Sequence, residues 1–133
     1  MAKNGLITLQ SVYDFGTTLG RLLTALEAKG VTIFSRIDHA AGAASVGLAL
    51  RPMTLVMFGN PAAGTPLMQA MQTTGIDLPL KALVWEDADG TVNLTYNDPY
   101  WVAARHELAS QVEQVVAAMA TTLKALAAHA TGA

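Results

Sequence analysis

The stretch FGNPAAGTPLM, residues 58–68, ends one predicted strand and begins the next predicted helix. Gly59 can adopt a positive φ and Pro61 fixes its own φ, so the segment predicts a tight loop. Thr65 suits the N-cap of a helix. Pro66 suits the first helical position, because an N–H at that position makes no hydrogen bond within the helix and proline therefore loses none. The stretch therefore predicts a strand, a loop and a helix in immediate succession.

The same loop holds no side chain that could act as an acid or a base. Backbone N–H groups at the N-terminus of a helix attract anions, so Asn60, Gly64 and Thr65 are candidate contacts to a small anionic ligand. The Lys-Ser/Thr pair of a phosphate-binding P-loop is missing. The alternative is a structural connection in which Asn60 bonds the local backbone.

Short apolar runs and one amphipathic helix precede the loop. Residues 6–9 and 31–37 are apolar or β-branched and predict strands. Asp14 predicts the N-cap of a helix whose apolar side chains recur at helical spacing. The small residues 40–46 predict a single helical turn. Residues 53–58 are continuously apolar, which predicts a central strand covered on both faces.

Beyond the loop, a helix after Pro66 should end near Gly75. Residues 80–85 then predict a strand. The sequence DADG at 87–90 predicts a hairpin connection, and residues 91–96 alternate cleanly as a second strand.

The C-terminal part predicts one long helix, with Asp98 as its N-cap and Pro99 at its first position. About 30 helical residues would span about 45 Å, so the helix should break, fray or pack against another subunit. Together the elements predict an α+β fold, in which helices pack on one face of an antiparallel sheet and a short helix is inserted after the central strand.

The composition bounds the organisation and the partners. A chain of 133 residues predicts one domain over residues 1–133. Charged residues make up 14% and hydrophobic residues 52%, which favours a buried subunit interface and therefore a homo-oligomer. The net charge is −2 and the basic residues are spread out, so neither nucleic acid nor an anionic membrane is an expected partner.

The absence of cysteine excludes disulfides, thiolate catalysis and cysteine-based zinc or iron–sulfur sites. No signal peptide or membrane-spanning run is recognised in the sequence, so a cytoplasmic location is expected. The sequence identifies no cofactor.

Five short motifs stand out at fixed spacing: FSRIDH (34–39), the 58–68 loop, DLPLK (77–81), WED (85–87) and YNDP (96–99). Over residues 6–108 the chain resembles the bacterial and archaeal domain-of-unknown-function family 302, with residues 109–133 completing the long helix. The resemblance implies a TATA-box-binding-protein-like β-α-β4-α topology, homodimers and no assigned function. The nucleic-acid binding of the TATA-box-binding protein is not implied for this chain, because a shared fold does not imply a shared function. Many relatives carry a lysine where Ala62 or Ala63 stands, so lysine-mediated anion binding is not implied here.

Arg105 falls on the apolar stripe of the predicted long helix, four residues after Trp101. A buried arginine must be paired, and the candidate partners are Asp38, Glu86 and Asp87. Arg105 could instead clamp a carboxylate or phosphate ligand. In that case a pocket between the sheet and the long helix would be lined by Tyr96, Trp101, Arg105 and the loop at Asn60.

Asp38 and His39 follow a predicted strand end, and with Glu86 and His106 they could form a metal site or an acid–base site. The alternative is that Asp38 caps the turn at 40–46 while His39 bonds loop backbone. The sequence therefore favours a ligand-binding or accessory module over an enzyme. Two alternatives stay open: a metal-dependent or acid–base enzyme, and a purely structural dimer.

Overall fold

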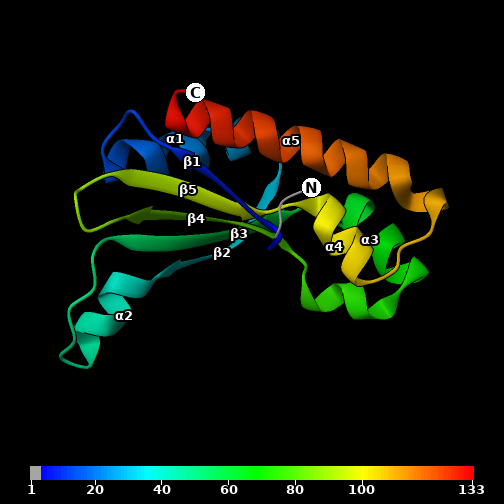
Figure 1. The fold of residues 1–133 in the computed structure, drawn as a ribbon, viewed down its shortest axis with the longest axis horizontal. Coiled ribbons are helices and arrows are strands. Elements are labelled where there is room, and N and C mark those ends of the chain that lie inside the picture. Colours follow the sequence, from blue (N-terminus) through cyan, green and yellow to red (C-terminus); the bar gives the residue numbers. More distant parts are fainter. Residues whose placement is uncertain (1–3) are drawn as a thin grey trace.

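The computed structural model describes residues 4–133 (Figure 1). Its elements follow one another as β1 (Leu6–Gln10), α1 (Phe15–Ala28), β2 (Thr32–Asp38), α2 (His39–Ser45), β3 (Met53–Gly59), α3 (Pro61–Ala70), η1 (Gln72–Ile76), β4 (Leu80–Glu86), β5 (Val92–Asn97), α4 (Pro99–Arg105), η2 (Ser110–Val112) and α5 (Glu113–Thr131). None of the helices within this part of the chain is both long and apolar enough to cross a bilayer.

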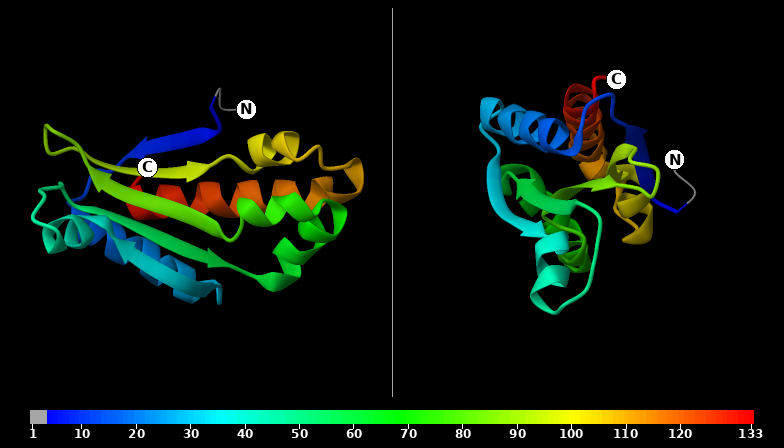
Figure 2. Two further views of the ribbon diagram at one scale, coloured as in Figure 1. Left: turned by 90° about the horizontal axis from the view of Figure 1, so that it is seen from below. Right: turned by 90° about the vertical axis from the view of Figure 1, so that its left-hand side faces the viewer.

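The five strands form one sheet in the order β1-β5-β4-β3-β2, and all neighbouring strands are antiparallel. Helices α1 and α5 lie together on one face of this sheet, and α2 projects on the other side (Figure 2). The predicted α+β class, the helix-covered sheet and the β-α-β4-α order are therefore confirmed.

The core lies between the sheet and helices α1 and α5. Along β3, the buried residues Thr54, Val56 and Phe58 alternate with half-buried ones, as the two-residue period of a strand requires. Leu22 and Leu26 of α1 are fully buried against this face. Hydrophobic burial of this covered face is the main source of the stability of the fold.

The other side of the sheet, which we call the open face, is not covered by α1 or α5. Ile37, Leu55 and Leu83 lie side by side across β2, β3 and β4, and Thr95 and Thr8 continue that row on β5 and β1. The open face is thus apolar on one half and polar on the other. The prediction that residues 53–58 are covered on both faces is wrong, because this face carries no helix layer.

Three of the predicted helix caps are confirmed. Asp14 accepts a hydrogen bond from the Thr17 N–H, Asp38 from the Ala41 N–H and Asp98 from the Tyr100 N–H. Each carboxylate satisfies a backbone donor that the helix itself cannot pair. Asp38 therefore has the structural role that the sequence offered as its alternative, and the 40–46 turn is a complete short helix, α2.

The start of α3 differs from the prediction. The N-cap is Asn60 rather than Thr65, and Pro61 rather than Pro66 occupies the first turn. The Asn60 side chain accepts from the Ala62 N–H at 3.0 Å, so the helix begins as soon as β3 ends. Pro66 lies inside the helix, where its ring removes one backbone hydrogen bond.

The predicted long helix is broken into α4, η2 and α5. Glu107 has a φ of +51°, a left-handed conformation that ends α4 directly after His106. The chain is extended at Ala109 before η2 and α5 begin. A continuous helix would have been longer than the domain is wide, and the break lets α5 return across the sheet instead.

We expect Leu26→Ala to lower the free energy of unfolding by about 2–5 kcal/mol, because Leu26 is completely buried and the truncation leaves a cavity. Val12→Ala, at a side chain that is 74% exposed, is the matched control and should change stability by less than about 0.5 kcal/mol. Urea denaturation followed by circular dichroism measures both. Equal effects would contradict the assignment of the core to the covered face.

Candidate functional site

A groove of about 900 Å³ runs along α3. Its walls are the loop and first turns of α3, the neighbouring ends of β2 and β3, the turn before β4, and α5. Phe58 and Leu126, which also belong to the buried core, lie at its base. Within the described part of the chain, no acidic, basic or histidine side chain lines this groove.

Small residues keep the groove open. Its α3 wall consists of Ala62, Ala63 and Gly64, and its α5 wall includes Ala118. A Cβ at Gly64 would lie 3.6 Å from the Leu78 Cδ1, which is ordinary contact, so this glycine is not required by packing. The width of the groove therefore follows from short side chains on two facing helices rather than from a special backbone conformation.

The predicted anion contacts do lie at the groove, because Asn60, Gly64 and Thr65 all line it. The N–H groups at this end of α3 are already used, however. Ala62 donates to the Asn60 side chain, and Ala63 and Gly64 donate to the Asn60 carbonyl oxygen. Since Pro61 has no N–H, the first turn offers no donor for an anion, and the structural interpretation of this loop is the one the geometry supports.

Arg105 lies elsewhere. It is the last residue of α4, its side chain is 50% exposed, and it donates to both carboxylate oxygens of Asp77 at 3.0 and 3.2 Å. The predicted partners Asp38, Glu86 and Asp87 were wrong, because they lie where β2 and β4 end, whereas α4 follows β5 at the opposite end of the sheet, beside the segment that precedes β4.

The other two residues of the predicted pocket do not meet Arg105 in a cavity. Tyr96 points into the covered core, where burial, with a smaller contribution from the Asp98 charge, raises its pKa. Trp101 packs so closely against Gly5 that a Cβ there would lie 2.5 Å from its ring. Trp101 also lies beneath the Arg105 guanidinium, 5.9 Å from ring centre to Cζ. The predicted pocket between sheet and long helix is therefore not formed.

Asp77 instead organises a polar cluster that the sequence did not predict. His106 is almost fully buried; its Nε2 pairs with Asp77 Oδ2 at 2.5 Å, and its Nδ1 lies 3.0 Å from the Thr73 hydroxyl. Lys81 donates to the main-chain oxygens of Asp77 and Pro79, and burial lowers its pKa against the opposing effect of the Asp77 charge. These contacts tie η1 and the start of β4 to the end of α4.

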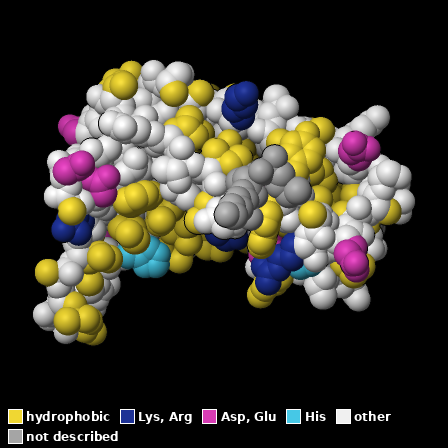
Figure 3. Space-filling view, viewed as in Figure 1, with side chains coloured by type: hydrophobic (Ala, Val, Ile, Leu, Met, Phe, Trp, Pro, Cys, Tyr) yellow, Lys and Arg dark blue, Asp and Glu magenta, His cyan; other side chains and the backbone are white. Residues whose placement is uncertain are grey.

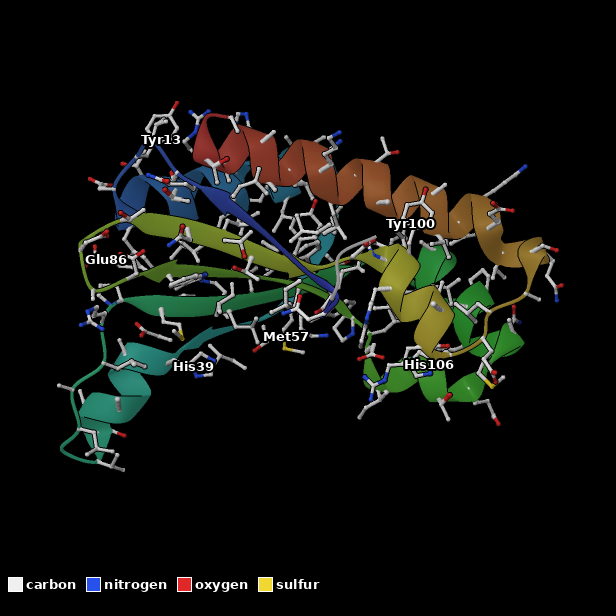
Figure 4. All side chains as sticks on the ribbon, viewed as in Figure 1. Tyr13, His39, Met57, Glu86, Tyr100 and His106 are labelled. Atoms are coloured by element: carbon white, nitrogen blue, oxygen red, sulfur yellow. The ribbon has the colours of Figure 1, made fainter. Side chains whose placement is uncertain are left out.

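The proposed metal or acid–base quartet is not assembled. Asp38, His39 and Glu86 follow or end strands β2 and β4, which run parallel to one another and finish at one end of the sheet. His106 follows β5, which runs the opposite way, and Figure 4 shows it far from His39. Across residues 4–133, no group of three His, Cys, Asp or Glu side chains could hold a metal ion.

Of the groove lining, only Asn60, Gly64 and Thr65 were predicted as site residues, and the others were missed because they come from segments far apart in the chain. Phe34 and Val115, for example, belong to β2 and α5. The local signal in the sequence is the small-residue run at 62–64, which suits a tight loop as well as the wall of a groove.

We expect Asp77→Ala to lower the free energy of unfolding by about 2–3 kcal/mol, because it leaves the buried His106 ring without its partner. Arg105→Ala should lower it by less than about 1 kcal/mol, since Arg105 is half exposed and its ion pair is screened by water. Urea denaturation at neutral pH compares the two. An equal loss in both variants would contradict the structural role given to the Asp77–His106 contact.

The chain was compared with known proteins. The fluoride-specific ion channel FluC 1 of Brucella suis biovar 1 (strain 1330) is 43% identical over 129 residues, which cover 97% of this chain and 51% of that protein. The fluoride-specific ion channel FluC 2 of Brucella melitensis biotype 1 shows the same identity, with 48% of its length covered. This chain thus spans about half the length of the curated relatives it matches.

A solved structure, that of an uncharacterized conserved DUF302 protein from Bacillus stearothermophilus, superposes with a TM-score of 0.83 at 18% identity. The superposition covers 95% of this chain and 98% of that one, and it shows a shared fold. The model of the family described as "Domain of unknown function DUF302" matches residues 7–126, and so extends beyond residue 108, where the resemblance in the sequence ended, into α5. The chain therefore belongs to the DUF302 family.

Proposed function

We propose that this chain is a non-catalytic binding module that holds an apolar small molecule in the groove beside α3. The observation that carries the proposal is the groove itself: about 900 Å³, with an uncharged lining. Sites for small molecules fall in the range of about 300–1,000 Å³ and are lined mainly by hydrophobic side chains with a few polar groups. The polar groups here come from Ser35, Asn60, Thr65, Gln114 and Thr122.

The lining favours an apolar ligand over the small anion that the sequence suggested. A buried anion needs a cation or several N–H donors to replace water, and otherwise its desolvation opposes binding. The groove has no cation in the described residues, because Arg105 and Lys81 belong to the Asp77 cluster, and its N–H donors are limited to the Asn60 and Gln114 amides, since the first turn of α3 is already paired.

The lining also favours binding over catalysis. General acid–base chemistry needs a titratable group within hydrogen-bond reach of the reacting atoms. The groove offers hydroxyls and amides, and the buried imidazole of His106 is held between Asp77 and Thr73 outside it. The groove can therefore bind and shield a ligand, while its side chains supply no acid or base.

Ala118→Trp tests this function, because Ala118 is exposed and lines the groove, so a larger side chain fills the space without disturbing the core. Binding of the neutral fluorescent probe N-phenyl-1-naphthylamine should weaken at least tenfold. The control is Ala125→Trp, an exposed position on the same helix outside the groove, which should bind like the unmodified chain. Failure of the unmodified chain to bind the probe, or equal binding by both variants, would refute the proposal.

A second role is favoured by the relatives. Nearly all of this chain matches about half of proteins named as fluoride-specific ion channels, and residues 4–133 contain no helix able to cross a bilayer. A channel needs membrane-spanning segments, so in those relatives the segments must lie in the half that this chain does not match. We propose that this chain acts as an accessory module to such a channel, in the cytoplasm.

Co-expression with a FluC-type channel tests the accessory role. The chain should co-purify with the channel in mild detergent, and deleting the chain from its host should raise the sensitivity of growth to fluoride. An unrelated small cytoplasmic protein with the same tag is the control. If the chain neither co-purifies nor alters fluoride sensitivity, the accessory role is wrong, while the groove proposal is unaffected.

We also propose that the module works as a homodimer. Its low content of charged residues supports this, as does the concentration of exposed aliphatic side chains near α2. A monomer with such surface would expose apolar area that a second copy can cover.

A further inference from the structure

One projection of the molecule is unusually apolar. Residues 39–51, which we call the arm, comprise α2 and the loop that leads back to β3, and they extend away from the body at the lower left of Figure 1. Residues 39–50 contain no Asp, Glu, Lys or Arg. In the loop that follows α2, Val46, Leu48 and Leu50 are 71%, 67% and 45% exposed. Three large aliphatic side chains are thus exposed to water on an arm whose one Lys, Arg, Asp or Glu residue is Arg51, directly before β3.

The open face of the sheet is a second apolar surface that no helix layer covers, and it begins where the arm ends. Met53, Leu55 and Met57 of β3 lie half-buried there, beside Leu83 and Trp85 of β4. Figure 3 shows hydrophobic side chains gathered over the strands next to α2 and again at the tip of the arm. In Figure 4, Met57 points from β3 to the side of the sheet away from α5.

We infer that two copies of this chain dock reciprocally, each laying its arm on the open face of the other. The inference rests on the homodimer proposed above and adds the surfaces that form it. One chain presents both an apolar projection and an apolar face, and a two-fold axis uses each of them twice, as an isologous interface requires.

The exposed area agrees with a second copy as the occupant. Val46, Leu48 and Leu50, with Ile37 at the edge of the open face, leave on the order of 400 Å² of apolar surface in water, as much as the largest patch on a typical monomer. A stable interface buries about 800 Å² on each partner. The arm and the half-buried side chains of the open face together supply the apolar part of such an interface.

Other occupants are less well matched to these surfaces. A bilayer or a nucleic acid would be met by clustered basic residues, whereas the arm carries one arginine, Arg51, and Lys81 on this face is bonded to main-chain oxygens. Pairing through the edge strand β2 is opposed by its irregular register between Ile33 and Ser35 and by the charge of Arg36.

Sedimentation velocity of the full chain tests the inference with two surface variants. Leu48→Lys on the arm and Ile37→Glu on the open face each place a charge in the contact, so each alone should raise the dimer dissociation constant at least tenfold. Val12→Glu is the control, since Val12 is 74% exposed on the loop between β1 and α1 and should leave the dimer intact.

Mixing the two variants gives the sharper result. A mixed dimer has one unmodified arm–face contact. In its other contact the lysine at position 48 of one copy faces the glutamate at position 37 of the other, and opposite charges attract. The mixture should therefore dimerise at a concentration at which neither variant does alone. Dimers of Leu48→Lys as tight as those of the unmodified chain, or a mixture that stays monomeric, would overturn the arm contact and leave the homodimer standing. A monomeric unmodified chain at high concentration would overturn both. Circular dichroism confirms that the variants are folded.

Discussion

The alternation of buried and half-buried side chains along β3 is the constraint from which the rest of the structure follows. It gives the sheet one strongly apolar face, and burying Val56 and Phe58 against α1 and α5 supplies much of the core. Two helices suffice to cover that face. The opposite face is therefore left without a helix layer, and its apolar half must meet something else.

The path of α5 produces the groove. The left-handed conformation at Glu107 ends α4 and lets the chain turn before α5 crosses the sheet. The first turns of α5 extend to α3, where the short side chains on both helices leave space between them. The Asp77 cluster holds α4 and the start of β4 in place beside this space, because it joins a buried imidazole, a half-exposed arginine and main-chain oxygens around one carboxylate.

The fold was largely predictable from the sequence because its signals are local. Asp14 and Asp98 cap helices in the structure as their positions predicted, and the apolar runs became strands. The predicted N-cap of α3 was wrong because two signals competed. Asn60-Pro61 and Thr65-Pro66 both suit the start of a helix, and the helix begins at the first pair, which comes directly after the strand.

The candidate site was much less predictable, because it depends on which distant segments meet. Arg105 pairs with Asp77, 28 residues away, and that contact exists because antiparallel pairing brings the start of β4 and the helix after β5 to the same end of the sheet. Whether His39 and His106 approach each other depends on the strand order, and the antiparallel order of the sheet separates them. The groove is lined by residues with no chemical signature of their own, so only their arrangement identifies it.

Native mass spectrometry of gently purified protein, followed by solvent extraction of the same sample, tests the central claim most directly. The account predicts that the chain carries an uncharged or weakly polar organic adduct that organic solvent removes, with no stoichiometric metal. A tightly held inorganic anion or a stoichiometric metal ion would contradict it, because no charged side chain lines the groove and no group of three His, Cys, Asp or Glu side chains in the described residues could hold a metal ion.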